Sequence, residues 1–453
     1  MKKLILLLLL LASVSAKSQM SAGLSATEKI YGLSKFWQEV NYNFIYYDKV
    51  DKEEWEELYK KTIAQVQDTK SDYEYYRVME KFCAYLKDGH TNVYFPKEIE
   101  ENINHTDFGD YRMQLSNIDG KAVITGINVS KKEEIPIGTE ITKVNGLSTK
   151  EYIEENVTPY ISSSTTYVLE DWGIRRLLGA LYGSKFDLEL QLPNGKTKQL
   201  TLTAERSTEK ELYPPMEQRE LLEFKWLKGG IAYVSLNSFS DPKIDSLFVE
   251  QLPELYKAKK LIIDLRYNGG GSTTIGKNIF QYLTNDTVLY GSKAQTRMNI
   301  STHKAWGKWV VAEDTLNNPE AKEMYLAFHD NVYYDMPYKA DSLSLDNKRV
   351  VVPTVLLIGH NTASAAEDFL IYADNQPHMT IIGEPSFGST GQPMMFDLPG
   401  GGYARICTKK DTYPDGKEFV GVGIQPDIKV SKTLKDFLEN KDPGLETAVK
   451  FLK

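Results

Sequence analysis

The sequence predicts a multidomain α/β protein, with a helical part at residues 25–91, a β-rich part at 106–206 and an α/β part at 220–435. Three observations lead to this prediction. The chain has 453 residues, more than a single hydrophobic core usually organises. Apolar residues follow a helical spacing in the first part, and short β-rich runs bounded by turns fill the second. In the third part strand, loop and helix patterns alternate, which is typical of a mainly parallel sheet covered by helices.

Residues 1–16 have the pattern of a secretory signal peptide. Lys2 and Lys3 precede the apolar run Leu4–Ala12, and the small residues Val14–Ala16 follow. The apolar run is far shorter than the roughly 20 residues that a membrane span needs. We therefore expect an exported protein, periplasmic or extracellular, that does not span a membrane.

Composition and charge narrow the range of partners and cofactors. A net charge of −8 argues against nucleic acid as a partner. The sequence has no HExxH, CxxC or calcium-loop motif, so neither a metal nor another cofactor is expected. Cys83 and Cys407 are the only cysteines, and their spacing leaves open whether they pair. The oligomeric state is open as well.

One segment of the β-rich part resembles the signature of PDZ domains. Ile137–Gly146 reads IGTEITKVNG, with Thr139 where that signature usually has Asp. A short helix near Thr149–Glu155 would follow, and the stretch Val157–Leu181 is longer than a minimal PDZ domain requires. The resemblance implies a domain that binds peptide by strand addition or through a free C-terminal carboxylate.

Two segments of the α/β part carry residues suited to acyl transfer. The strand at 261–266 runs into Gly269–Gly271, whose backbone amides can approach a ligand closely and hold an oxyanion. The second segment places Ser364 at the start of a helix over 365–373, where free amides favour a developing negative charge. Each segment alone has an ordinary alternative: a flexible turn for the glycines, and for Ser364 a capping box closed by Glu367.

Together with two later segments, these motifs resemble a serine peptidase family, that of the C-terminal processing proteases and the tricorn core protease. The matching segments are DLRYNGGG at Asp264–Gly271, ASAAE at Ala363–Glu367, GEPSFG at Gly383–Gly388 and GVGIQPD at Gly421–Asp427. With the helical and PDZ-like parts, the resemblance spans nearly the whole mature chain. It implies a catalytic domain of the ClpP/crotonase-like fold with Ser364 as nucleophile. The amides of Gly270 or Gly271 and of Ala365 would form the oxyanion hole.

The resemblance also implies the general base. The processing proteases use a Ser–Lys pair, but Ser389 stands where their lysine would be. The tricorn-like branch uses a histidine before its PDZ domain, and His90 within Asp88–Thr91 matches its DGHT motif. His90 is thus the expected base and His360 the fallback. Gly89 is expected to supply the backbone conformation that stops the preceding helix.

Glu418 is the candidate for the acid that orients His90. Tricorn-like relatives place a glutamate shortly before the last glycine of GVxPD, where this chain has Val420, and Glu418 lies just upstream. An exposed acid after Asp415–Gly416 is an equal alternative for Glu418. The expected function is that of an extracytoplasmic serine endopeptidase acting on peptides or unfolded proteins. The alternative is a catalytically inactive family member that binds a peptide or a lipophile, because a fold does not guarantee its chemistry.

Overall fold

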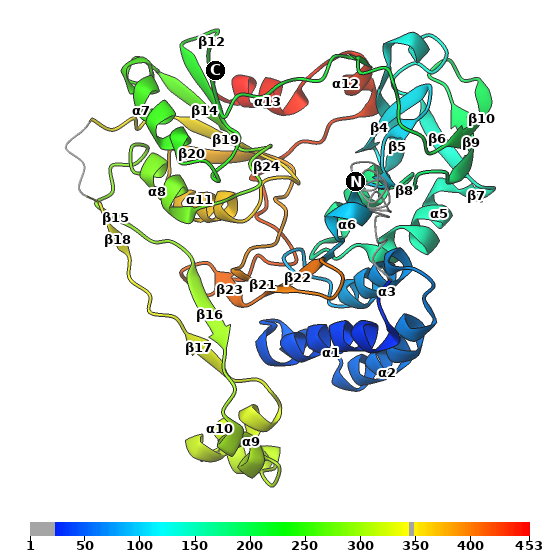
Figure 1. Ribbon diagram of the computed structural model, residues 1–453. Helices are drawn as coiled ribbons and strands as arrows, with labels where there is room; N and C mark the ends of the chain where they lie inside the picture. The colour runs from blue at the N-terminus through cyan, green and yellow to red at the C-terminus, as the bar shows by residue number, and fades with distance from the viewer. Residues whose placement is uncertain (1–22, 344–347) are drawn as a thin grey trace, which may run out of the picture.

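The computed structural model describes residues 23–343 and 348–453, so the expected signal peptide lies outside the described residues. The chain forms a helical region, a β-rich region and an α/β region, shown at the lower right, upper right and upper left of Figure 1. The multidomain α/β class predicted from the sequence is confirmed.

The helical region consists of α1 (Ala26–Asn43), α2 (Lys52–Asp68) and α3 (Asp72–Ala84). Ser25 and Glu28 form a capping box that starts α1, since the carboxylate and hydroxyl satisfy amides at the helix end. Buried aromatic side chains at helical spacing fill the core between these helices: Phe36, Trp55, Tyr75, Tyr76 and Phe82. The same core includes Ala404 and Ile406, so the helical region packs directly on the α/β region.

A short strand after α3 joins these two regions. β1 (Asn92–Tyr94) pairs antiparallel with β22 (Tyr403–Cys407), which in turn pairs with β21 (Pro393–Asp397). The register places Val93 opposite Ala404. Because His90 lies two residues before β1, this pairing fixes its loop on the α/β region.

The β-rich region is an antiparallel sheet in the order β10-β9-β6-β5-β4-β3. Its strands are β3 (Asp107–Phe108), β4 (Tyr111–Ile118), β5 (Lys121–Asn128), β6 (Glu140–Val144), β9 (Lys185–Gln191) and β10 (Thr197–Thr203). Asp119 and Gly120 both have positive φ, 56° and 74°, as a tight two-residue hairpin turn between β4 and β5 requires. Two helices, α5 (Thr149–Asn156) and α6 (Thr166–Arg175), complete the region.

The α/β region is built on a six-stranded sheet in the order β12-β13-β14-β19-β20-β24. The strands are β12 (Leu222–Leu227), β13 (Ile231–Leu236), β14 (Lys260–Asp264), β19 (Thr354–Ile358), β20 (Met379–Gly383) and β24 (Ile428–Lys429). All neighbouring pairs are parallel except β12 and β13.

Helices cover both faces of this sheet (Figure 1). Ile263 and Leu356 face the core beneath α7 (Lys243–Leu255), α8 (Thr273–Phe280) and α11 (Ala365–Ala373). Ile262 and Val355 face the opposite side, which α13 (Pro443–Phe451) covers. Burial on both faces explains why these strands are continuously apolar rather than alternating.

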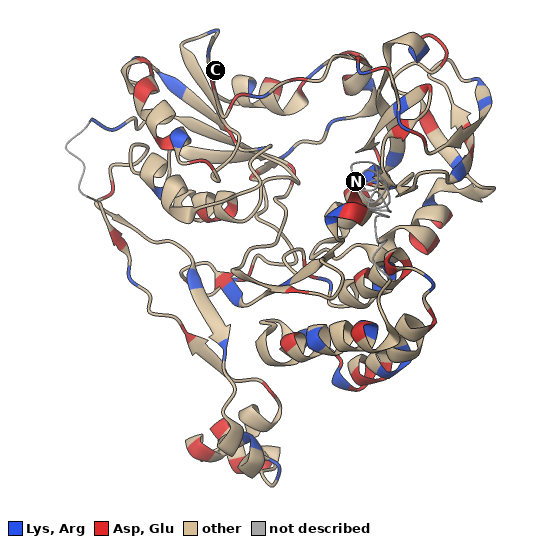
Figure 2. Cartoon of the chain, viewed as in Figure 1, with Lys and Arg blue, Asp and Glu red and all other residues tan. Residues whose placement is uncertain are grey.

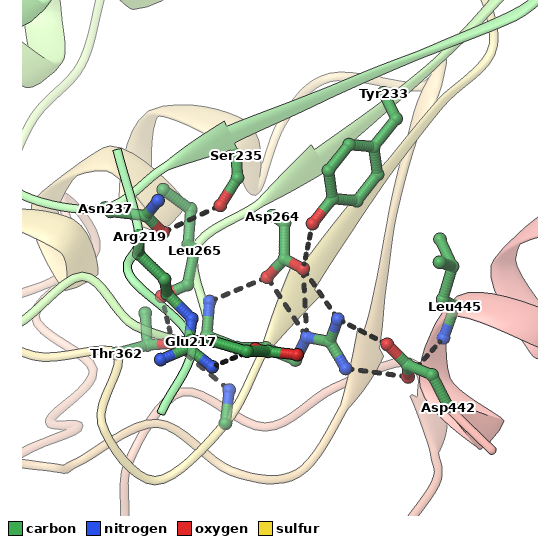
Figure 3. Close-up of polar contacts among 12 residues, drawn as sticks. Glu217, Arg219, Tyr233, Ser235, Asn237, Asp264, Leu265, Thr362, Asp442 and Leu445 are labelled. Carbon is green, nitrogen blue, oxygen red and sulfur yellow. Dashed lines mark hydrogen bonds and ion pairs between the residues drawn. The ribbon is translucent and has the colours of Figure 1, made fainter. Parts of the chain in front are cut away.

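The charged residues at the end of β14 have a structural role (Figure 3). The fully buried carboxylate of Asp264 accepts hydrogen bonds from the Tyr233 hydroxyl at 2.9 Å and from the Arg266 guanidinium. Arg266 also donates to both oxygens of Asp442, each at 2.8 Å, and Asp442 caps α13 by accepting from the Leu445 amide. This network ties the sheet to α13 just before the glycine loop begins.

An arm extends from the α/β region, at the lower left of Figure 1. It is formed by β16 (Lys293–Arg297), β17 (Tyr333–Asp335), α9 (Ser301–Gly307) and α10 (Pro319–Phe328). Figure 2 shows acidic and basic residues interspersed along the molecule, the arm included. Within residues 23–343 and 348–453, no helix has both the length and the apolar character for crossing a bilayer.

Candidate active site

Ser364 occupies a strained turn between β19 and α11. Its backbone has φ 56° and ψ −122°, a conformation that costs a side-chain-bearing residue about 1–3 kcal/mol. Its amide donates to the Glu367 carboxylate at 3.0 Å, and its side chain is half-buried. Strain of this kind persists only where the surrounding structure imposes it, and it is concentrated at functional sites.

The glycine loop lies directly against Ser364. A Cβ atom on Gly270 would come within 2.7 Å of the Ser364 Cβ, so only glycine allows this approach. The Gly270 amide already donates to Asn268 Oδ1 at 3.0 Å, which removes it as an oxyanion donor. Gly271 forms a parallel bridge with Phe239 in which its neighbours make the hydrogen bonds, so its own amide points away from Phe239.

Two amides near Ser364 therefore stay free. Among the described residues, neither the Gly271 nor the Ala365 amide donates a hydrogen bond. Ala365 begins α11, where the first amides of a helix have no internal partner and the helix dipole favours negative charge. A pair of unoccupied amides beside a serine is what an oxyanion hole requires.

Glu367 connects the nucleophile turn to the loop after β20. Its fully buried carboxylate accepts from the Ser364 amide, from the Ser386 hydroxyl at 2.6 Å and from the Gly388 amide at 2.8 Å. Burial raises the pKa of Glu367 to about 8, although these donors act in the opposite direction. The sequence pattern indicates only a local cap, whereas the carboxylate in fact holds two distant segments together.

His90 lies beside the end of that loop. Its Nδ1 is 2.7 Å from the Oγ of Ser389, which is completely buried. Burial, with the nearby positive charges of Arg405 and Lys409, lowers the pKa of His90 to about 4. The ring is therefore neutral at pH 7, and its Nε2 makes no hydrogen bond to any described residue.

Gly89 serves close packing rather than helix termination. The positive φ after α3 belongs to Lys87, at 49°, and α3 has already ended at Ala84. A Cβ on Gly89 would lie 2.7 Å from the Phe387 ring and 3.1 Å from Ser389 Oγ. The expectation that Gly89 stops the helix is thus wrong, and the physical reason for glycine is the contact that brings His90 to Ser389.

The structure links Ser364 to His90 through this loop rather than by a direct bond. The link runs from Ser364 to Glu367, from Glu367 to the Gly388 amide, and from neighbouring Ser389 to His90. No hydrogen bond joins Ser364 to His90 within the described chain. Catalytic hydrogen bonds are often long without substrate and tighten in the substrate complex.

Lys409 lies close enough to His90 to lower its pKa, but it cannot act as a general base because it remains protonated. Its ammonium pairs with the Asp411 carboxylate at 3.0 Å, and carboxylates including Asp411 and Asp368 raise its pKa despite the opposing effect of burial. A lysine can accept a proton only when its pKa is lowered. Lys409 therefore stays protonated at neutral pH.

The structure does not bring Glu418 to His90. Its carboxylate pairs with Lys49 at 3.4 Å and with Lys410, and its side chain is 45% exposed. The hydrogen bond from Lys410 is the main reason why its pKa is lowered. Glu418 is a surface ion-pair residue, and the side chain that contacts His90 Nδ1 is instead that of Ser389, which the motif comparison did not indicate. One feature of the sequence indicated that position 389 matters: Ser389 occupies the position of the lysine in the processing proteases.

His360, the fallback base, is bound elsewhere. Its Nδ1 lies 2.7 Å from the Asp171 carboxylate on α6, and its ring stacks on Tyr167 at 4.5 Å. The Tyr167 hydroxyl donates to the carbonyl of Ser386 at 2.6 Å. His360 therefore belongs to the contact between the β-rich and α/β regions.

Comparisons with known proteins agree with this geometry. Residues 230–430 match the model of peptidase family S41. A carboxy-terminal-processing protease of Bartonella bacilliformis is 32% identical over 93 residues, 20% of this chain and 21% of the relative. A carboxyl-terminal-processing protease of Synechocystis is 24% identical over 218 residues, 48% of this chain and 41% of the relative. The chain thus aligns with less than half the length of either relative.

Similarity to a solved structure extends over the whole fold. The structure of mature CPAF complexed with lactacystin has a TM-score of 0.67 to this protein at 14% identity. The match covers 94% of this chain and 97% of CPAF, so it supports a shared fold.

The fold, the glycine loop and the serine turn agree with the match to this family of peptidases. Residues 230–430 are thus similar to peptidase family S41. The resemblance to C-terminal processing proteases that the sequence motifs predict is confirmed.

Proposed function

We propose that this protein is an extracytoplasmic serine endopeptidase with Ser364 as nucleophile and His90 as general base. The observation that carries the proposal is the strained Ser364 turn packed against Gly270, with the free amides of Gly271 and Ala365 beside it. Neither a helix cap nor a flexible glycine turn accounts for this combination.

The reaction is an acyl transfer in two steps. Ser364 Oγ attacks the peptide carbonyl carbon while His90 Nε2 takes the hydroxyl proton, and the amides of Gly271 and Ala365 stabilise the oxyanion. The tetrahedral intermediate collapses, the carbon–nitrogen bond breaks, and His90 returns the proton to the leaving amine. Water, deprotonated by His90, then hydrolyses the ester on Ser364 and restores the hydroxyl.

Ser389 positions His90 in place of a carboxylate. For Nε2 to accept a proton, Nδ1 must carry the hydrogen of the neutral ring, and Ser389 Oγ at 2.7 Å is its acceptor. The same bond persists when the ring becomes an imidazolium. A neutral hydroxyl stabilises that charge less than a carboxylate would, which agrees with the low pKa of His90.

Each predicted domain has a part in this function, although the helical one shares its hydrophobic core with β22. Residues 25–91 carry the His90 loop, residues 106–206 form the PDZ-like domain, and residues 220–435 hold Ser364. The PDZ-like domain would present extended peptide to the catalytic domain. The signal peptide at residues 1–16 would direct the enzyme to the periplasm or the medium.

A fluorophosphonate probe tests the proposal directly, because it labels only an activated serine. We expect the purified protein to be labelled at Ser364, as located by mass spectrometry of the digested adduct. Ser364→Ala should remain unlabelled, and a mixed peptide library should be cleaved by the wild type alone. A folded wild type that neither reacts nor cleaves would favour the inactive peptide- or lipophile-binding alternative.

Replacing Ser389 with alanine should lower kcat about 10- to 100-fold while leaving KM near the wild-type value. The estimate follows from the loss of one hydrogen bond to a charged ring, about 1.5–3 kcal/mol. The ¹⁵N chemical shifts of the His90 ring should indicate the Nδ1–H tautomer alone in wild type and a mixture of both tautomers in Ser389→Ala. An unchanged tautomer in a slowed Ser389→Ala variant would assign the effect to general disturbance instead.

A further inference from the structure

A cavity of about 980 Å³ lies where the three regions meet. Helix α3 forms one wall with Arg77, the end of α6 forms another with Arg176, and β22 forms a third with Arg405. Figure 1 shows α3 and α6 as neighbours at the junction of the helical and β-rich regions. The volume is at the upper end of the range for ligand pockets, about 300–1,000 Å³, so it can accept several side chains of a peptide.

The interior of this cavity has an excess of positive charge. Arg77 pairs with Glu80 at 2.5 Å, but Arg405 donates only to Asn92 Oδ1 and to the Gly89 carbonyl, at 2.9 and 3.4 Å. Arg176 forms no ion pair with any described residue. The lining holds five basic side chains and three acidic ones: Arg77, Lys97, Arg175, Arg176 and Arg405, against Glu80, Glu100 and Glu101. Burial raises the pKa of Glu80 to about 7, so the negative charge of this carboxyl is partial at neutral pH.

Aromatic rings hold the arginines in place. The Arg77 guanidinium lies 3.6 Å from the centre of the Tyr160 ring, and that of Arg176 lies 4.9 Å from a Trp172 ring centre. Arg405 lies over Tyr94, whose ring stacks on Tyr403 at 4.5 Å. Guanidinium groups held in this way lose little entropy when they bind a carboxylate.

The cavity also borders the loop that carries His90. Gly89 and Phe387 contribute to its wall, Gly89 precedes His90, and Arg405 bonds to the Gly89 carbonyl. An extended peptide advances about 3.3 Å per residue. If a substrate peptide is bound with its scissile bond at His90, the side chains of its next residues would therefore enter the cavity.

We propose that this cavity binds carboxylate groups of the peptide substrate, either acidic side chains or the free C-terminus. The proposal rests on the proposed peptidase function and assigns to that peptidase a preference for peptide segments that carry a carboxylate. Arginine matches a carboxylate with two parallel hydrogen bonds, which gives geometric selectivity as well as attraction. Arg176 is the principal ligand, because it forms no ion pair with a carboxylate of the described residues, whereas Arg77 pairs with Glu80.

Binding is measured with the full-length Ser364→Ala protein, which cannot cleave. The probes are fluorescein-labelled octapeptides of alternating Ala and Glu, or Ala and Gln, each with a free or an amidated C-terminus. Fluorescence anisotropy should show at least tenfold tighter binding for a carboxylate-bearing peptide than for the amidated Gln peptide. Amidated Glu and free Gln peptides separate side-chain recognition from C-terminal recognition.

Arg176→Gln in this background should weaken binding of the preferred peptide about tenfold and leave the amidated Gln peptide unaffected. Arg206→Gln is the matched control: Arg206 also lies over an aromatic ring, Tyr182 at 5.1 Å, but does not line the cavity. Arg176→Glu should reverse the preference toward Ala–Lys octapeptides. Equal affinity for all four peptides, or equal effects of Arg176→Gln and Arg206→Gln, would overturn the proposal.

Cleavage assays separate this inference from the proposed function. If wild type cleaves the library but Arg176→Gln cleaves carboxylate-bearing and amidated neutral peptides in the same ratio as wild type, the cavity assignment fails and the peptidase stands. If wild type cleaves nothing while Ser364→Ala binds carboxylate peptides through Arg176, the peptidase assignment fails and the carboxylate site stands.

Discussion

Ser364→Ala is expected to abolish peptide hydrolysis while the thermal midpoint changes by only a few degrees. The substitution removes the attacking oxygen that stands beside the free amides of Gly271 and Ala365. The Ser364 side chain makes no hydrogen bond to the described chain, whereas its backbone amide keeps the bond to Glu367. Turnover with a defined peptide, together with calorimetry, measures both effects. Wild-type-like turnover by folded Ser364→Ala would exclude the mechanism.

Ser364→Gly provides the matched control for strain. Glycine adopts φ 56° and ψ −122° without steric cost, which removes about 1–3 kcal/mol of strain, but its unfolded state is more flexible by about 0.5–1 kcal/mol. Ser364→Gly should therefore be inactive yet about 1 kcal/mol more stable than Ser364→Ala. An equal or lower stability would mean that the turn is not strained.

Elements of the α/β region could be predicted closely because their local signals are strong. The predicted helix at 365–373 has the observed limits, and the predicted strand at 261–266 is observed at Lys260–Asp264. Continuous apolar runs bounded by glycine, proline and polar residues indicate strands buried on both faces. Their pairing follows from the right-handed crossovers that parallel strands require.

The candidate site could be predicted less completely from the sequence, because its contacts join segments that are distant in the chain. His90 and Ser389 are 299 residues apart in the chain, and no local pattern encodes their hydrogen bond. The two glutamates illustrate the difference. Glu367 has a recognisable local cap pattern, but its bonds to Ser386 and Gly388 could not be predicted from spacing. The prediction for Glu418 rested only on its position just before the GVGIQPD motif, and in the structure its carboxylate pairs with two lysines instead.

His90→Ala is expected to lower kcat by a factor on the order of 10³ or more, the loss that follows removal of a triad member. His360→Ala should keep kcat within severalfold of wild type, because His360 is bonded to Asp171 and stacked on Tyr167. Steady-state kinetics on one peptide compares the two variants. Loss of activity only in His360→Ala would transfer the base role to His360.

The pH dependence of kcat/KM distinguishes a buried base from an exposed one. Burial disfavours the imidazolium, and Arg405 and Lys409 disfavour it further, so the pKa of His90 is about 4 rather than 6.5. A base works only while unprotonated, and activity should therefore persist through pH 6 and fall as pH drops through about 4. The stability of the fold should also fall as pH drops. In the unfolded chain His90 binds a proton near pH 6.5, whereas in the folded protein it does so only near pH 4. Wild type should therefore lose stability relative to His90→Ala as pH falls from about 6.5 to about 4. An acid limb at pH 6 to 7, with no such difference in stability, would show that the catalytic base is not buried His90.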